Sequence, residues 1–285
     1  MEKVELAVIG GSGFYSWPEL ENSDSLSLVT PFGSPSERIV IGELAGKKCA
    51  FLARHGLGHR LNPAEVNYRA NLFAMKMLGA KTLISVVAVG SLKEEIHPTD
   101  LVIPDQYVDN TFKREKTFFA DGITAHVSLA QPTCPRYTAQ AHKTALQMEL
   151  RVHNGGTYFN MEGPQFSSLA ESLLYRQFGF SVIGMTQGVE AKLARELEMC
   201  FLPLAFVTDY DCWHQGAEVV STEMIIRNLQ LTVNSAKKMI LEISSSLPIG
   251  QCDCGNALAG AIVTDPDCIP EETRRKLALV ISRYL

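Results

Sequence analysis

Residues 201–213 have the sequence Phe-Leu-Pro-Leu-Ala-Phe-Val-Thr-Asp-Tyr-Asp-Cys-Trp. The apolar run Phe201–Val207 predicts a buried strand, and Asp209 and Asp211 follow directly at its carboxyl end. In an open α/β sheet, ligands bind in the crevice beyond the carboxyl ends of the strands. On spacing alone, two carboxylates in this place indicate either a binding site or an acidic loop that Trp213 covers.

Four other apolar segments end in the same way, in a glycine-rich or polar turn. These turns are residues 10–13, 54–56, 90–91 and 185–186. If the strands before them lie in one sheet and point the same way, the turns form one crevice together with the acid pair. An anion site beside two acids suits a reaction in which phosphate attacks one part of a substrate while an acid assists departure of the other.

Apolar periodicity predicts helices between these strands. Within residues 64–78, Val66, Ala70, Phe73 and Met77 are spaced by four, three and four residues, as on one face of a helix. The run 82–89 is apolar throughout, which indicates a central strand buried on both faces. Other strands are expected at 5–9, 38–43, 48–53, 100–104, 156–161 and 181–185. Other helices are expected at 136–150, 189–197, 222–245 and 271–284, and one more is expected to begin at the turn 162–168.

Strands thus alternate with helices, and no linker or internal repeat interrupts them. We expect an α/β fold, with one domain spanning residues 1–285 and a central, mostly parallel mixed β-sheet flanked by helices. Residues 106–130 are expected to be irregular, and a segment of that length is usually functional or covered by a partner subunit.

The composition excludes several classes of protein. The net charge is −5, and Lys and Arg are scattered, which argues against nucleic acid as a partner. No apolar run is long enough for a membrane span, and the first residues lack the apolar core of a signal peptide, so we expect no membrane partner and a cytoplasmic location.

The seven cysteines do not follow a metal-binding pattern in the sequence. Cys252-Asp-Cys254, together with Cys268, lacks the paired C-x-x-C spacing of structural zinc sites, so we expect no metal. The other four stand alone in the sequence and are expected to be small buried hydrophobic side chains: Cys49, Cys134, Cys200 and Cys212. The redox state of Cys252 and Cys254 stays open.

Seven motifs in order along residues 6–245 resemble the phosphorolytic nucleoside phosphorylases, and within them the 5′-methylthioadenosine phosphorylase branch. They are Gly10-Gly-Ser-Gly13, Thr30-Pro-Phe-Gly-Ser-Pro35, Ala53-Arg-His-Gly56, Val66-Asn-Tyr-Arg-Ala-Asn71, Val89-Gly-Ser-Leu-Lys-Glu-Glu-Ile96, Glu162-Gly-Pro-Gln-Phe-Ser-Ser168 and Thr208-Asp-Tyr-Asp-Cys-Trp213. The tail 248–285 is less diagnostic.

The resemblance implies a pentosyltransferase that cleaves the N-glycosidic bond of S-methyl-5′-thioadenosine. The products would be adenine and 5-methylthioribose 1-phosphate, in purine and methionine salvage, with phosphate as co-substrate and neither metal nor organic cofactor. Asp209 would be the catalytic residue and, with Asp211, would hold the purine edge. Met185 would lie under the ribose, and Phe166 would face the purine or sugar.

The implied phosphate ligands are Ser12, Arg54, His55, the backbone of Ala88, and Thr186. His126 matches a position from which a neighbouring subunit closes the 5′ pocket, which implies a homotrimer or a hexamer and leaves open which of the two.

Two alternatives remain at this point. A sister activity on 6-oxopurine nucleosides usually has Asn in place of the first Asp, so Asp209 favours adenine, whose 6-amino group donates to a carboxylate. A non-catalytic nucleotide-binding protein would rest on Gly10–Gly13, whose glycine spacing is wrong for that role. The chain also departs from the family pattern at Val87, where relatives have Thr, and at Gln187–Glu190, where they have Pro before Glu.

Overall fold

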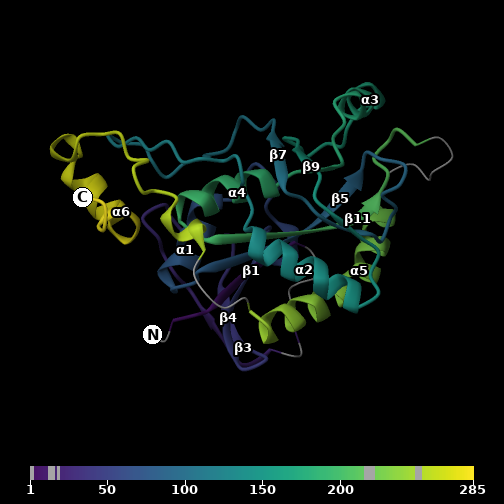
Figure 1. Cartoon of the computed structure of the whole chain (residues 1–285), viewed down its shortest axis with the longest axis horizontal. Helices are drawn as coiled ribbons and strands as arrows, with labels where there is room; N and C mark the ends of the chain where they lie inside the picture. Colours follow the sequence, from purple (N-terminus) through teal and green to yellow (C-terminus); the bar gives the residue numbers. More distant parts are fainter. Residues whose placement is uncertain (1–2, 12–16, 18–19, 215–221, 248–251) are drawn as a thin grey trace.

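The structure is a computed structural model that describes residues 3–11, 17, 20–214, 222–247 and 252–285. Its described part contains an eleven-stranded mixed sheet with helices on both faces (Figure 1). The strands are β1 (Leu6–Gly10), β2 (Glu21–Leu26), β3 (Ile39–Leu44), β4 (Lys47–Ala53), β5 (Thr82–Ser91), β6 (Leu101–Ile103), β7 (Gln106–Asp109), β8 (Val152–Asn154), β9 (Thr157–Asn160), β10 (Val182–Gly184) and β11 (Cys200–Asp209). The helices are α1 (Tyr68–Met77), α2 (Pro135–Gln147), α3 (Leu169–Gln177), α4 (Gln187–Glu196), α5 (Thr222–Ser245) and α6 (Glu271–Ile281).

Strand β5 is the centre of the sheet. It pairs in parallel with β1 and β11, and its last residues pair antiparallel with β10. The sheet continues from β1 through β4, β3 and β2 on one side, and from β10 through β9 to β7 on another. Six of the ten strand pairings are parallel, so the predicted mostly parallel mixed sheet is confirmed.

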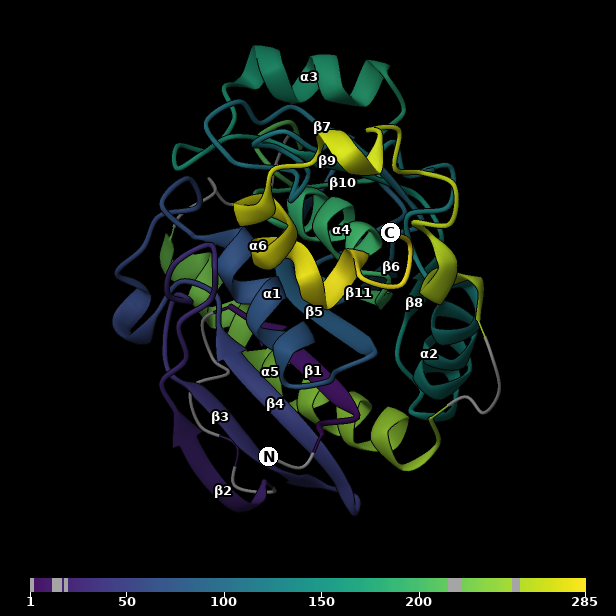
Figure 2. The ribbon, with the colours of Figure 1, turned by 90° about the vertical axis from the view of Figure 1, so that its left-hand side faces the viewer.

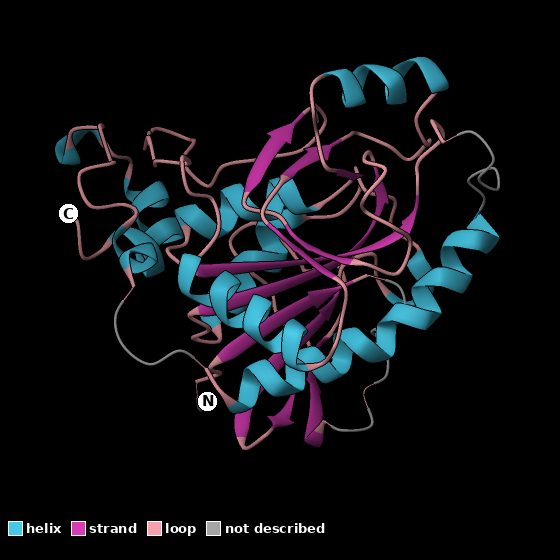
Figure 3. Ribbon diagram, turned by 45° about the vertical axis from the view of Figure 1, so that its right-hand side comes forward, coloured by secondary structure: helices cyan, strands magenta, loops and turns pink. Residues whose placement is uncertain are grey.

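The two faces of the sheet pack against different helices. Along β1, Ala7 and Ile9 pack with residues of α1, α4 and α6, whereas Leu6 and Val8 pack with residues of α2 and α5. This alternation follows from the two-residue side-chain period of a strand. Figures 2 and 3 show the resulting order of helix, sheet and helix, with α6 beside α1. No helix in the described ranges is long and apolar enough to cross a membrane.

Most predicted elements are present, and the differences have local causes. Helix α1 begins at Tyr68 because the Asn67 side chain accepts a hydrogen bond from the Ala70 N–H and caps it. The other predicted strand and helix boundaries differ from the observed ones by at most three residues. The sequence analysis missed β2, β7 and β8, whose residues are polar or very few and therefore carry little apolar alternation.

Candidate functional site

The carboxyl end of β11 holds the predicted acid pair. Asp209 is the last residue of the strand, and both it and Asp211 are buried. One oxygen of Asp209 accepts a hydrogen bond from the Thr208 hydroxyl (2.8 Å), and the other accepts from the Asp211 N–H (2.7 Å). Asp211 has a φ of +53°, so the backbone turns back over the first carboxylate. The structure therefore brings both acids together, and neither lies on an exposed loop.

Burial changes the acidity of both carboxyl groups. The pKa of Asp209 is raised to about 6, mainly by desolvation, and the nearby charge of Asp211 adds to this effect. Desolvation also raises the pKa of Asp211. The Ser172 and Ser167 hydroxyls beside Asp211 partly offset this rise in pKa, although one buried oxygen of Asp211 has no hydrogen bond of normal geometry among the described residues. An acid that titrates close to neutrality can give a proton to a leaving group, and an unpaired oxygen can accept from a ligand.

Gly90 of β5 makes room for the Asp209 carboxylate. A Cβ atom at this position would lie 2.9 Å from an oxygen of Asp209 and 3.3 Å from the Asp211 nitrogen. The pairing of β11 with β5 is irregular between Val207 and Asp209, which directs the acidic end of β11 toward this glycine. The turn predicted at Gly90-Ser91 is wrong, because both residues belong to β5 and pair there with β10, but Gly90 does lie beside the acids.

The buried Arg54 lies at the opposite end of the site. Its Nε donates to Glu190 at 2.5 Å, and a terminal nitrogen donates to the second oxygen of Glu190 at 3.1 Å. Burial lowers the pKa of Arg54, but attraction to the Glu190 carboxylate is the larger effect, so the pKa of Arg54 is raised overall. The sequence analysis noted Glu190 only in a departure from the family pattern and missed it as the partner of Arg54.

The remaining donors of Arg54 fix it to the sheet. Nη2 donates to the Ile9 carbonyl and the Ser85 hydroxyl, and one N–H of Nη1 donates to the Val86 carbonyl, so the second N–H of Nη1 has no recorded acceptor among the described residues. A Cβ atom added to Gly11 would lie 3.7 Å from a terminal nitrogen of Arg54, so this nitrogen faces the start of the glycine turn. Ser12, whose hydroxyl is predicted to bind phosphate, lies outside the described residues.

Strand β5 runs between the Arg54 end of the site and the acid pair. Arg54 donates to the carbonyl of Val86, and Asp209 pairs with Gly90, four residues further along the strand. At the rise of a β-strand this separation is about 13 Å. Ala88, halfway between them, is the one residue of β5 that is not fully buried. An elongated ligand could lie over Ala88, with one end at Arg54 and the other at the acid pair.

His55, one of the phosphate ligands implied by the resemblance, directly follows Arg54 and is buried. Its Nδ1 lies 2.9 Å from the Leu61 carbonyl oxygen, so Nδ1 carries the hydrogen and donates. Desolvation, the charge of Arg54 and the adjacent His59 lower the pKa of His55 to about 3. The ring is therefore neutral near pH 7, and its Nε2 can only accept a hydrogen bond.

The amino terminus of α4 completes the anion end. Thr186 follows β10 and is the N-cap residue of α4, but its buried side chain makes no capping hydrogen bond. Its hydroxyl is thus left for a ligand, next to the positive end of the helix dipole. Met185, directly before it, packs against the Glu162–Pro164 turn, since a Cβ on Gly163 would lie 2.5 Å from the Met185 sulphur.

Arg114 organises the other side of the site, a role that sequence reasoning missed. Its side chain is fully buried, and its Nε lies 3.2 Å from a Glu162 carboxylate oxygen. It also donates to the Tyr68 hydroxyl and to the backbone carbonyls of Met185 and Glu162. This single guanidinium therefore holds Met185 beside the turn that leads to Phe166, which is 48% exposed. Its place in the irregular segment 106–130 was the only signal in the sequence.

His126 lies apart from the other predicted residues. Its side chain is exposed, and its backbone N–H donates to the Ala261 carbonyl at 2.8 Å, so it belongs to the surface formed with the C-terminal segment. That segment ends in α6, at the side of the molecule opposite the carboxyl ends of β5 and β11 (Figure 1). The chain does not bring His126 to its own acid pair.

Comparisons with known proteins agree with this arrangement. The model of the phosphorylase superfamily matches residues 5–245. S-methyl-5′-thioadenosine phosphorylase from Geobacter sulfurreducens is 49% identical over 287 residues, covering 100% of both chains.

Two solved structures are also similar. Methylthioadenosine phosphorylase from an Antarctic soil metagenomic library has a TM-score of 0.92 and 44% identity, covering 98% of this chain and 99% of that one. The Schistosoma mansoni enzyme in complex with adenine has a TM-score of 0.82 and 32% identity, covering 98% of each chain. The resemblance predicted from the motifs is therefore confirmed, and the chain belongs to the phosphorylase superfamily, in its S-methyl-5′-thioadenosine phosphorylase branch.

Proposed function

We propose that this chain catalyses the phosphorolysis of S-methyl-5′-thioadenosine to adenine and 5-methylthioribose 1-phosphate. The observation that carries the proposal is the buried Asp209–Asp211 pair, joined along β5 to an anion end formed by Arg54 and Thr186. Relatives with this activity that match the whole chain support the same assignment. The reaction uses phosphate as its second substrate.

The acid pair acts on the leaving purine. As phosphate attacks C1′, the C1′–N9 bond breaks and its electron pair moves onto the purine ring. The raised pKa keeps a fraction of Asp209 protonated near neutral pH, so it can share a proton with N7 as charge develops there. The unpaired oxygen of Asp211 accepts from the 6-amino group. A 6-oxopurine would bring an acceptor against these oxygens, which favours adenine over inosine-type substrates.

Phosphate binds mainly through neutral donors. Because Glu190 balances the charge of Arg54, attraction comes from the α4 dipole, the Thr186 hydroxyl, the Ser12 hydroxyl and the free donor of Arg54. Neutral His55 accepts the hydrogen of a protonated phosphate oxygen or of a ribose hydroxyl. The backbone of Ala88 lines the centre, Met185 lies under the ribose, and Phe166 covers the sugar or purine.

The working enzyme is a homo-oligomer, a trimer or a hexamer, in which His126 of one subunit closes the 5′ pocket of its neighbour. The exposed side chain of His126, on the surface formed with the C-terminal segment, supports this arrangement. Helix α3 projects from the rest of the chain (Figure 1), and its Leu169, Leu173 and Leu174 are exposed. Exposed apolar side chains grouped in this way indicate a surface that another subunit covers.

Substitution of Asp209 by Asn tests the proposed function directly. Loss of the shared proton should lower kcat for methylthioadenosine by about 10²–10⁴-fold. The amide can donate to a 6-oxo group, so the ratio of inosine to methylthioadenosine turnover should rise. Steady-state release of free base from both substrates measures this, with the exposed Asp267→Asn as control. Full activity with unchanged adenine preference in Asp209→Asn would refute the role of this carboxylate.

Asp209 should also make stability depend on pH in a defined direction. Its pKa is raised from 3.8 to about 6, so the unfolded chain loses this proton first, and the folded state loses stability as pH rises from about 4 to 6. Above about pH 6 this ionisation lowers the free energy of unfolding by on the order of 3 kcal/mol. The Asp209→Asn variant has no such loss. In urea unfolding at constant protein concentration, the free energy of unfolding of the variant minus that of the parent should rise from pH 4 to pH 6. Above about pH 6 this difference should stay constant. A pH-independent difference would contradict the raised pKa.

The Arg54–Glu190 pair predicts different results for single and double substitutions. Arg54→Ala should destabilise the chain by about 3–5 kcal/mol, since it leaves the Glu190 carboxylate buried and unpaired. Arg54→Met combined with Glu190→Gln should recover most of that stability but keep a raised KM for phosphate. Thermal unfolding and phosphate titrations at saturating nucleoside separate the two effects. A double variant with the parent's KM for phosphate would exclude Arg54 from the site.

Subunit mixing tests His126. His126→Ala should raise KM for methylthioadenosine and leave KM for phosphate unchanged. When His126→Ala and Asp209→Asn subunits are mixed, some sites combine Asp209 of a His126→Ala subunit with His126 of a neighbouring Asp209→Asn subunit. Activity at low methylthioadenosine concentration should therefore exceed the sum of the activities of the two variants alone. Light scattering confirms the oligomer throughout. Absence of this gain after verified subunit exchange would place His126 outside the neighbour's site.

A further inference from the structure

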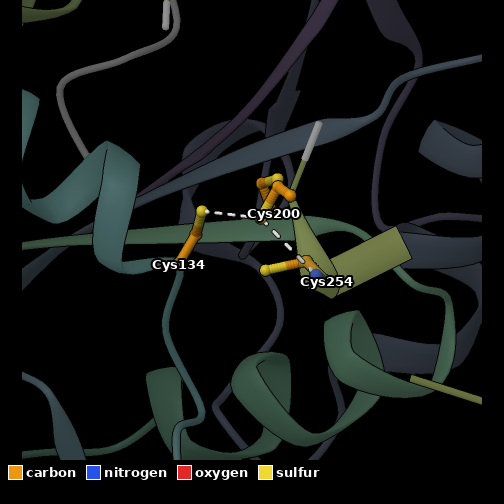
Figure 4. A group of neighbouring side chains, drawn as sticks. Cys134, Cys200 and Cys254 are labelled. Carbon is orange, nitrogen blue, oxygen red and sulfur yellow. Dashed lines mark hydrogen bonds between the residues drawn. The ribbon is translucent and has the colours of Figure 1, made fainter. Parts of the chain in front are cut away.

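Four cysteines that are far apart in the sequence meet at one end of the sheet. Cys134 is the N-cap residue of α2, Cys200 begins β11, and Cys252 and Cys254 lie at the start of the short 3-10 helix Asp253–Asn256. Their four sulphur atoms all lie within 4.8 Å of one another. Figure 4 shows three of the four side chains, those of Cys134, Cys200 and Cys254, close together. The expectation that Cys134 and Cys200 are small buried hydrophobic side chains is confirmed for the burial of Cys134 and is wrong for Cys200, which is partly exposed.

Backbone contacts bring these residues together. The Cys134 N–H donates to the Phe201 carbonyl at 2.9 Å, which holds the start of α2 against the start of β11. The sulphur of Cys134 lies 3.4 Å from that of Cys252. The Cys254 N–H donates to the Cys252 sulphur, also at 3.4 Å. An N–H group directed at sulphur stabilises a thiolate, and such outer contacts orient the ligands of metal sites.

The spacing of the sulphurs suits a tetrahedral metal ion. Zinc–sulphur bonds of about 2.3 Å in tetrahedral geometry place the sulphurs about 3.8 Å apart. The 3.4 Å between the sulphurs of Cys134 and Cys252 and the upper limit of 4.8 Å for the whole group lie on either side of this value. The group consists of four thiols without a carboxylate or imidazole, which favours zinc over magnesium or calcium. Cys134 and Cys254 are buried, whereas Cys200 and Cys252 are partly exposed and leave a path for the ion.

We propose that Cys134, Cys200, Cys252 and Cys254 bind one structural Zn²⁺ ion. Four thiols and Zn²⁺ give a tetrathiolate complex, and up to four protons are released to solvent. All four coordination positions come from the protein, so the site is closed and takes no part in the phosphorolysis.

The ion ties the C-terminal segment 252–285 to α2 and β11. That segment carries α6, whose Leu277, Val280 and Ile281 pack in the same core cluster as α1. It also carries Ala261, which accepts the hydrogen bond from His126. The proposed zinc site would therefore fix the surface that presents His126, although the proposal itself does not depend on the activity of the chain.

Metal analysis of the full, untagged chain tests the proposal. Protein purified under reductant and freed of loose metal by brief chelation should contain close to one zinc per chain by mass spectrometry. X-ray absorption should show four sulphur ligands at about 2.3 Å. Cobalt substitution should give the intense visible bands of tetrahedral thiolate coordination. Zinc removal should lower the midpoint of thermal unfolding.

Matched variants locate the ion. Cys252→Ser and Cys134→Ser should lose most of the zinc, while Cys268→Ser, which changes an exposed cysteine outside the group, should retain it. If a variant does not fold, the X-ray absorption spectrum of the parent still shows whether four sulphur ligands bind zinc. Four free thiols without metal, a mass deficit of two hydrogens per disulfide under non-reducing conditions, or iron in place of zinc would each overturn the proposal.

Discussion

The bidentate ion pair between Arg54 and Glu190 is the contact on which the geometry of the site depends. It joins the end of β4 to α4, and the same guanidinium donates to carbonyls of β1 and β5. A buried pair of this kind adds little net stability, because desolvation of the two ions offsets their attraction. Its effect is positional: both partners are fully buried, and removing either leaves an unpaired charge in the core.

This pairing also decides how the site attracts an anion. With the arginine charge balanced and His55 neutral, the anion end relies on fixed dipoles: the first turn of α4 and nearby hydroxyl groups. Such donors need no reorganisation when charge moves during the reaction. Arg114 has a parallel role at the sugar side, where its ion pair with Glu162 leaves further donors for the carbonyl of Met185.

At the acid pair, burial of the carboxyl groups lowers the stability of the folded chain but raises their pKa, which suits them to proton transfer. Asp209 is buried with a pKa near 6 and has only the Thr208 hydroxyl and the Asp211 N–H as recorded hydrogen-bond donors. A further donor to the Asp209 carboxylate would lower its pKa and make it a poorer acid at neutral pH. Gly90 maintains the arrangement, because any side chain there would press on the Asp209 carboxylate.

The sequence by itself determined the order of strands and helices, the buried central strand β5 and the acid pair at the end of β11. These features are local, since apolar periodicity and strand-end turns are visible within short windows. The polar edge strand β2 and the short β7 and β8 were missed because their pairing comes from neighbours far along the chain. Only the tertiary structure decided that Arg54 pairs with Glu190, that Arg114 holds Met185, and that Cys134 and Cys200 meet Cys252 and Cys254. Residues separated by tens of positions leave no periodic pattern, and their contacts exist only once the sheet and its helices have packed together.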